Sequence, residues 1–127
     1  MLAVYDRRQL PGSAQLFGIV EENAPIAVCG LECYGADGLL RSLAVDPAYR
    51  GRGLGHLLVR RAETEAARQG ATALFLLTTT AADFFARLGY ESIPRAQAPA
   101  AIAQTTQFSS LCPASSAFMR KRLTPPC

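Results

Sequence analysis

The feature that most constrains the fold of this chain is an apolar segment that runs through a glycine-rich loop into an amphipathic helix. Residues 39–45 (LLRSLAV) predict a strand, glycines alternate in residues 51–55 (GRGLG), and apolar residues recur at helical spacing over residues 53–69. Residues 72–79 (TALFLLTT) are too continuously apolar for a strand with one wet face, so we expect a central strand there. A strand–helix–strand crossover joins parallel neighbours in a sheet.

The remaining segments predict antiparallel strands and two further helices. Residues 15–22 and 26–34 read as a hairpin. We expect a short helix capped by Thr80 and ended by Gly89. Further along, the pattern predicts a strand over 90–95, a helix over 99–108 and a strand over 115–122. The fold class is therefore α/β (α+β): residues 1–127 form a single domain with a mixed, mostly antiparallel sheet, a parallel central pair and flanking helices.

The glycine loop has the chemistry of a phosphate site. Glycine lets backbone N–H groups approach a ligand closely, and the N–H groups at a helix N-terminus attract anions. Arg50 and Arg52 add positive charge beside them. A kinase-type P-loop (GxxxxGK followed by Ser or Thr) is absent, and a dinucleotide fingerprint fails because His56 stands where its last glycine belongs. What remains is Arg-x-x-Gly-x-Gly, formed by Arg50, Gly53 and Gly55.

Charge and hydropathy limit the classes of ligand that this chain can bind. The net charge is +3, and nearly half of the 13 basic residues lie between Arg41 and Arg68. This fits a small phosphate-bearing ligand and is too weak to indicate nucleic acid. No stretch approaches the roughly 18–20 apolar residues of a membrane helix, and charges interrupt residues 1–8 where a signal peptide would be apolar. We expect a cytosolic protein that binds neither membrane nor nucleic acid.

The four cysteines predict free thiols. Cys29, Cys33, Cys112 and Cys127 form no CxxC pair. Cys29 and Cys33 share a strand face but would lie about 13 Å apart at ~3.3 Å per residue, too far for one metal ion. We therefore expect no metal site.

The strand–loop–helix string LRSLAVDPAYRGRGLGHLLVRRAE resembles the signature of the GCN5-related N-acetyltransferases, and FFARLGY resembles a second segment of that family. The resemblance covers residues 15–95 in the expected order. LLTTTAADFFARLGY and SLCPASSAFMRK look most like N-acetyltransferases encoded with arsenic-resistance genes, which resemble N-acetylglutamate synthase domains.

This resemblance implies an acetyl-CoA-dependent N-acetyltransferase with a GNAT-like fold. The cofactor-binding residues would be those of the third strand, which offer backbone groups to the pantetheine arm, and those of the loop, which hold the pyrophosphate. They are Leu43, Ala44 and Val45 for the first group and Arg50, Gly51, Arg52, Gly53, Leu54 and Gly55 for the second.

The resemblance leaves the catalytic groups open. Many relatives place a tyrosine general acid where this chain has Phe85, so Tyr34, Tyr90 or water would have to substitute. Glu32 is our candidate base and Tyr34 our candidate acid; the alternative is a solvated Glu32 and a packed Tyr34. His56 sits in the first helical turn beside the phosphate site, which argues against catalysis.

Three residues are candidates for binding the acceptor. Arg41 interrupts an apolar strand and needs a partner. It is either a fork for the carboxylate of an amino-acid substrate or half of a structural ion pair. Thr78 and Thr79 lie at the end of the central strand, where open α/β sheets commonly bind ligands.

The N-terminus is shorter than in the family, with only residues 1–14 before the hairpin and room for at most a turn or a short strand. Three consequences stay open: an open acceptor site, a site completed by a partner subunit, or a protein that is no longer a full enzyme. The functional alternatives are an acetyltransferase for a small amine and a non-catalytic acyl-CoA-binding or regulatory module. A sheet edge exposed by the missing first strand favours a homodimer.

Overall fold

The computed structural model describes residues 2–7, 14–22, 24–105 and 116–123. In chain order the elements are β1 (Leu2–Arg7), β2 (Ala14–Glu21), β3 (Ala24–Tyr34), β4 (Asp37–Val45), the 3-10 helix η1 (Pro47–Tyr49), α1 (Leu54–Arg68), β5 (Ala73–Thr78), α2 (Ala82–Arg87), β6 (Glu91–Ser92), the 3-10 helix η2 (Arg95–Gln97), α3 (Ala100–Ala103) and β7 (Ala117–Arg122).

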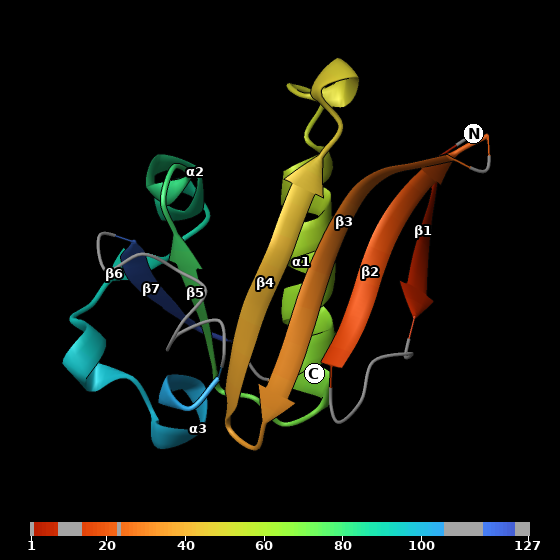
Figure 1. Ribbon diagram of the computed structural model, residues 1–127. Helices are drawn as coiled ribbons and strands as arrows, with labels where there is room; N and C mark the ends of the chain where they lie inside the picture. Colours follow the sequence, from red (N-terminus) through yellow and green to blue (C-terminus); the bar gives the residue numbers. More distant parts are fainter. Residues whose placement is uncertain (1, 8–13, 23, 106–115, 124–127) are drawn as a thin grey trace.

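The strands form one sheet in the order β1-β2-β3-β4-β5-β7-β6 (Figure 1). Among the strands of the described residues only β4 and β5 run parallel, because α1 carries the chain back across the sheet between them; the other pairs are antiparallel. This confirms the predicted fold class. The N-terminal residues form the short strand for which we expected room, but the prediction that the edge beside β2 is exposed is wrong, since β1 pairs with β2 along its whole length.

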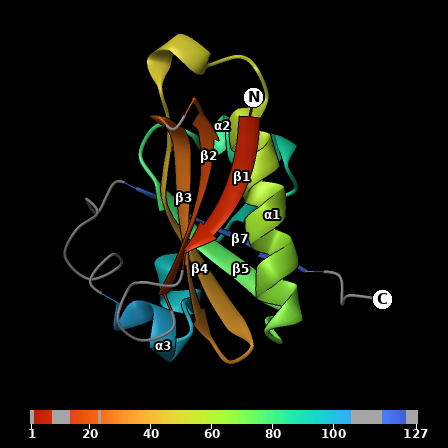
Figure 2. The same ribbon diagram turned by 90° about the vertical axis from the view of Figure 1, so that its right-hand side faces the viewer.

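The sheet lies between two layers of helix. Figures 1 and 2 show α1 along one face and α3 on the other. Leu58, Val59, Ala62 and Ala66 of α1 are fully buried against the sheet at helical spacing. On the other face Ile102 of α3 packs in a second, smaller cluster with Leu39, Phe75 and Phe118.

Three local predictions need correction. Ala81, not Thr80, is the N-cap of α2, and it makes no side-chain cap hydrogen bond. The predicted strand over 90–95 is reduced to the two residues of β6, after which Pro94 leads into η2. The helix predicted over 99–108 covers only residues 100–103 within the described chain; residues 106–108 lie outside the described residues.

Candidate functional site

The site lies where β4 and β5 separate. The two strands are paired only over residues 37–39 of β4 and 73–75 of β5. Beyond this short ladder they diverge, β4 toward the glycine loop and β5 toward α2 (Figure 1). Residues 40–45 of β4 therefore have no strand partner on the side that faces β5, and their backbone groups there are available to a ligand.

β4 also carries a bulge beside this gap. Its register against β3 shifts between the pairs Val28↔Ala44 and Gly30↔Arg41, so one residue of β3 faces two residues of β4, 42 and 43. A bulge bends its strand and increases the local twist. The bend falls where β4 leaves β5, which helps to open the gap.

A cavity of about 580 Å³ lies between the end of β4, the glycine loop and the start of α2. It is lined by Leu43, Ala44, Val45, Tyr49, Arg50, Gly51, Gly53, Leu54, Gly55, His56, Ala81 and Phe84. None of these residues is acidic. Eight of the nine predicted cofactor-binding residues therefore line one cavity, and an anion that enters it meets no like charge from the lining.

The glycine loop has the conformation expected of a backbone anion site. Gly51 and Gly53 have φ of 82° and 76°, a region that favours glycine, and a Cβ at either position would meet no atom within 4 Å. α1 begins directly after Gly53, whose carbonyl accepts from Leu57 N at 3.1 Å. Residues 54–56 belong to the first turn of the helix. Their N–H groups have no acceptors within the helix and therefore attract anions.

The two arginines of the loop take different positions. Arg50 lines the cavity, whereas Arg52 does not. The Arg52 guanidinium lies 4.9 Å from the centroid of the Tyr49 ring, a cation–π contact. Tyr49 itself lines the cavity, and sequence reasoning missed it because an aromatic residue in a turn carries no signal of its own.

A second cavity, of about 260 Å³, lies between β4, the end of β5 and the start of α2. Its lining consists of Leu40, Arg41, Leu43, Leu76, Leu77, Thr78, Thr79, Thr80, Ala81 and Phe85. The three predicted acceptor-binding residues, Arg41, Thr78 and Thr79, are thus brought together from two strands. The lining residues include one arginine and three threonines, and none of them is acidic.

The two cavities adjoin. Leu43 and Ala81 line both of them. Beside this junction the Thr78 Oγ1 accepts a hydrogen bond of 2.9 Å from Ala81 N, which leaves the Thr78 hydroxyl proton free to donate. Two ligands, one in each cavity, would meet at the unpaired edge of β4.

Arg41 forms an ion pair with Glu32 of β3, which also accepts a hydrogen bond from Tyr34 of the same strand. Arg41 Nη1 donates to Glu32 Oε2, and the Tyr34 hydroxyl donates to Glu32 Oε1. Burial, together with the hydrogen bond to Glu32, raises the pKa of Tyr34 to about 12. Neither Glu32 nor Tyr34 lines either cavity. Of the two alternatives for Arg41, the ion pair with Glu32 is present, and Arg41 is also one of the residues that line the second cavity.

The comparisons with known proteins agree with this geometry. Residues 12–92 match the family model for the acetyltransferase (GNAT) domain. The chain belongs to the GNAT acetyltransferase family. The predicted family resemblance is thereby confirmed.

Its relatives in sequence are amino-acid acetyltransferases. The chain is 39% identical over 98 residues to the amino-acid acetyltransferase of Pseudomonas fluorescens, a match that covers 75% of this chain and 23% of the relative. The chain thus spans about a quarter of the length of such relatives.

Solved structures show the same fold. N-acetylglutamate synthase from Neisseria gonorrhoeae, complexed with coenzyme A and N-acetyl-glutamate, superimposes with a TM-score of 0.77 at 20% identity, over 86% of this chain and 26% of that one. A candidate acyl-CoA N-acyltransferase from Klebsiella pneumoniae gives 0.76 at 19% identity over 98% and 99%.

Two aromatic residues near the site of this GNAT domain do not supply an acid. Phe85 lines the second cavity but has no ionisable group. Tyr90 packs edge-on against Phe85, and its hydroxyl donates to Glu63 Oε2 at 2.9 Å on the α1 side of the sheet. Burial and the nearby Glu63 raise the pKa of Tyr90. Tyr90 lines neither cavity of the gap, so a packing role fits its position.

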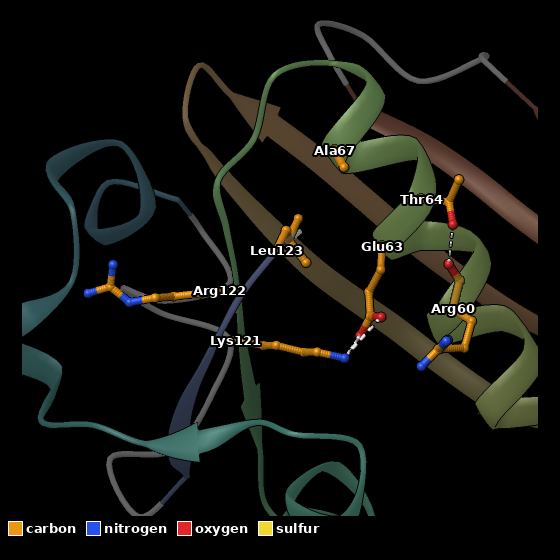
Figure 3. A pocket seen from close by; sticks show the side chains of 7 residues that line it. All are labelled: Arg60, Glu63, Thr64, Ala67, Lys121, Arg122 and Leu123. Atoms are coloured by element: carbon orange, nitrogen blue, oxygen red, sulfur yellow. Dashed lines mark hydrogen bonds and ion pairs between the residues drawn. The ribbon is translucent and has the colours of Figure 1, made fainter. Parts of the chain in front are cut away.

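Glu63 belongs to a third cavity, of about 260 Å³, between α1 and the end of β7. Figure 3 shows Lys121 reaching from β7 to the Glu63 carboxylate, at 3.1 Å between Nζ and Oε2. With Tyr90, this contact ties three segments together. We interpret the cluster as a structural tie because its charges satisfy each other.

The cysteines of the described segments are buried. Cys29 is free, and burial raises the pKa of its thiol to about 12. Cys112 and Cys127 lie outside the described residues. Within the part of the chain that the structure describes, no group of three His, Cys, Asp or Glu side chains could hold a metal ion. No helix in those segments is long and apolar enough to span a membrane.

Proposed function

We propose that this domain transfers the acetyl group of acetyl-CoA to the amine of a small, amino-acid-like acceptor. One observation carries the proposal: a cavity lined by the glycine loop adjoins a second cavity lined by an arginine and three threonines, and Leu43 and Ala81 line both. Family membership and the amino-acid acetyltransferase relatives support it.

The residues of the first cavity fit coenzyme A. Gly51 and Gly53 leave open the space that a Cβ would fill, and the lining contains Arg50 but no acidic residue. The glycine loop would hold the pyrophosphate. The unpaired edge of β4 at residues 43–45 would hold the amide groups of the pantetheine arm, because backbone N–H and C=O groups there lack strand partners on that side.

When bound, acetyl-CoA supplies an acetyl thioester that an amine attacks at its carbonyl carbon, with release of the thiol. The same β4 edge carries N–H groups that can donate to the carbonyl oxygen as negative charge develops on it. The two cavities align the reactants, which removes much of the entropic barrier of a bimolecular step. The leaving thiol has a pKa of about 8.5 and departs with modest help.

The lining of the second cavity favours an acceptor that carries a carboxylate. Arg41 provides the fork that matches a carboxylate, and Thr78 and Thr79 provide donors beside it. We propose glutamate and glutamate-like compounds as acceptors, including phosphinic and arsonic analogues. The similarity of LLTTTAADFFARLGY to arsenic-resistance acetyltransferases supports the latter group.

Thiol release from acetyl-CoA tests the proposal. The purified protein is assayed against free amino acids, glutamate-like phosphinic and arsonic analogues, and simple amines, with coenzyme A binding followed by calorimetry. Turnover on an amino-acid-like acceptor is the expected result. If coenzyme A binds but no amine is acetylated, the proposal that this domain is an enzyme is refuted.

That second result would support a non-catalytic acyl-CoA-binding or regulatory module. The specific observation in its favour is Phe85, which places an apolar ring in the second cavity at the position of the family's tyrosine acid. Absence of coenzyme A binding would refute both functions.

We also propose a cytosolic homodimer. β1 is an edge strand of the sheet, and an edge strand offers unpaired backbone groups to a second copy. Light scattering coupled to size exclusion would show twice the mass of the chain; the mass of a single chain would refute the dimer.

A further inference from the structure

We propose that Glu32 is a positioning residue: together with Tyr34 and Gly30 it holds the Arg41 guanidinium in the orientation that binds the acceptor carboxylate. This inference rests on the proposed function and names the residues that decide its substrate class. The Glu32 carboxylate has two oxygens, and each has its own donor: Arg41 Nη1 at Oε2 and the Tyr34 hydroxyl at Oε1.

The two partners of the ion pair differ in burial and in their access to the second cavity. The Glu32 side chain is 11% exposed and the Arg41 side chain 33% exposed. Only Arg41 lines the second cavity. Of the two partners, Arg41 is therefore the one that an acceptor in this cavity can reach. Because a guanidinium has five N–H donors in a rigid fork, Arg41 keeps donors for a second carboxylate after Nη1 has paired with Glu32.

Gly30 makes room for this arrangement. It lies opposite Arg41 in the β3–β4 register and two residues before Glu32, on the same face of the strand. A Cβ on Gly30 would come within 3.0 Å of Arg41 Cγ and 3.3 Å of the Arg41 carbonyl oxygen. The glycine thus allows the aliphatic part of Arg41 to cross β3 and bring the guanidinium to Glu32.

This geometry assigns Glu32 a different role from a general base. Its oxygens already accept two hydrogen bonds, and the residue lines neither of the cavities where an amine would bind. A residue that positions Arg41 affects the binding of carboxylate-bearing acceptors, whereas a base affects the chemical step for every amine.

The test compares Glu32→Gln and Gly30→Ala with the unchanged protein. Steady-state constants are measured with L-glutamate and with its two amides, L-glutamine and L-isoglutamine, each of which lacks one carboxylate. We expect both substitutions to raise KM for the carboxylate-bearing acceptor at least about tenfold while kcat changes little, because a hydrogen bond to a charged group is lost or displaced. The amide that lacks the bound carboxylate should show no such increase.

Glu91→Gln is the matched control. Glu91 pairs with Arg120 at 2.7 Å on β6, at the far edge of the sheet, so the substitution breaks another carboxylate–arginine pair without touching either cavity. Its KM and kcat should equal those of the unchanged protein. Gly30→Ala keeps every charge, including the Glu32 carboxylate. It therefore separates the effect of moving the Arg41 side chain from the effect of removing a charge in Glu32→Gln.

The outcomes separate the inference from the proposed function. A fall in kcat of about 10²–10⁴ in Glu32→Gln with normal kinetics in Gly30→Ala would identify Glu32 as a base and overturn the inference. Acetylation of both amides as efficiently as L-glutamate would also overturn it while leaving the acetyltransferase intact. If the unchanged protein acetylates no amine and L-glutamate shows no binding by calorimetry, both proposals fail.

Discussion

Replacing Gly53 by alanine separates the contribution of the glycine loop to stability from its contribution to coenzyme A binding. Gly53 has a φ of 76°, and a Cβ there would meet no atom within 4 Å. The substitution therefore creates no clash in the free protein, and its cost in stability comes from the left-handed backbone alone. For a residue with a Cβ this cost is about 1–2 kcal/mol, which corresponds to a fall in Tm of roughly 4–8 °C in a domain of this size.

Gly70 provides a matched control. It follows α1 at its other end, has a φ of 97°, and also has open space around a Cβ. Gly70→Ala should therefore lose a similar free energy of unfolding. Only Gly53 lines the first cavity, where an added methyl group would stand between the loop backbone and a pyrophosphate. We expect Gly53→Ala to weaken coenzyme A binding at least about tenfold, since a charge-assisted hydrogen bond contributes ~1.5–3 kcal/mol.

The assay is calorimetric titration of coenzyme A into both variants, with urea denaturation to measure stability. Similar losses of stability with a selective loss of affinity in Gly53→Ala would support the assignment of the loop. Equal affinity in the two variants would refute it. A large loss of stability in Gly53→Ala alone would refute the statement that the space around Gly53 is open.

Three further predictions concern two buried groups and the half-buried Tyr34. Because burial raises the pKa of Cys29 to about 12, a thiol reagent at about pH 8 should label Cys29 in the unfolded chain and not in the folded one, as mapped by mass spectrometry. Tyr90→Phe should lower the free energy of unfolding by about 1.5 kcal/mol or more, measured in urea, because the buried carboxylate of Glu63 loses a donor; an unchanged midpoint would contradict this. The pKa of Tyr34 is raised to about 12, so the folded state holds the phenolic proton more tightly and this contribution to stability is present below about pH 10 and disappears as the pH rises through 12. The ultraviolet difference titration between the unchanged protein and Tyr34→Phe should have its midpoint near 12, and a midpoint near 10 would show that burial and the hydrogen bond to Glu32 do not raise the pKa of Tyr34.

Short-range rules were sufficient for the strand–loop–helix unit. The helix predicted over 53–69 is α1 over 54–68, and Gly53 and Gly70 at its ends both have positive φ. Helical periodicity and the need for glycine at positive φ are properties of neighbouring residues, so they are visible in the order of the amino acids. For the same reason eight of the nine residues predicted for the cofactor cavity lie together along one continuous segment.

Predictions failed where packing over long distances decides local structure. The error at the start of α2 was local instead: Thr78, two residues before Thr80, accepts the hydrogen bond from Ala81 N. The short helix α3 owes its place to Ile102, which is buried among side chains of three strands. Segments of a few residues have no strong preference of their own, so the tertiary contacts select their conformation.

The amino-acid sequence by itself determined the chemistry available to this GNAT domain: a backbone anion site, an arginine in an apolar strand and hydroxyl groups at the end of another. Only the tertiary structure decided that they form one site. Arg41 meets Glu32 because the β3–β4 register places Gly30 opposite Arg41, and it shares a cavity with Thr78 because β4 and β5 separate after three paired residues. Register and strand separation arise from contacts between residues far apart in the chain, which no local pattern records.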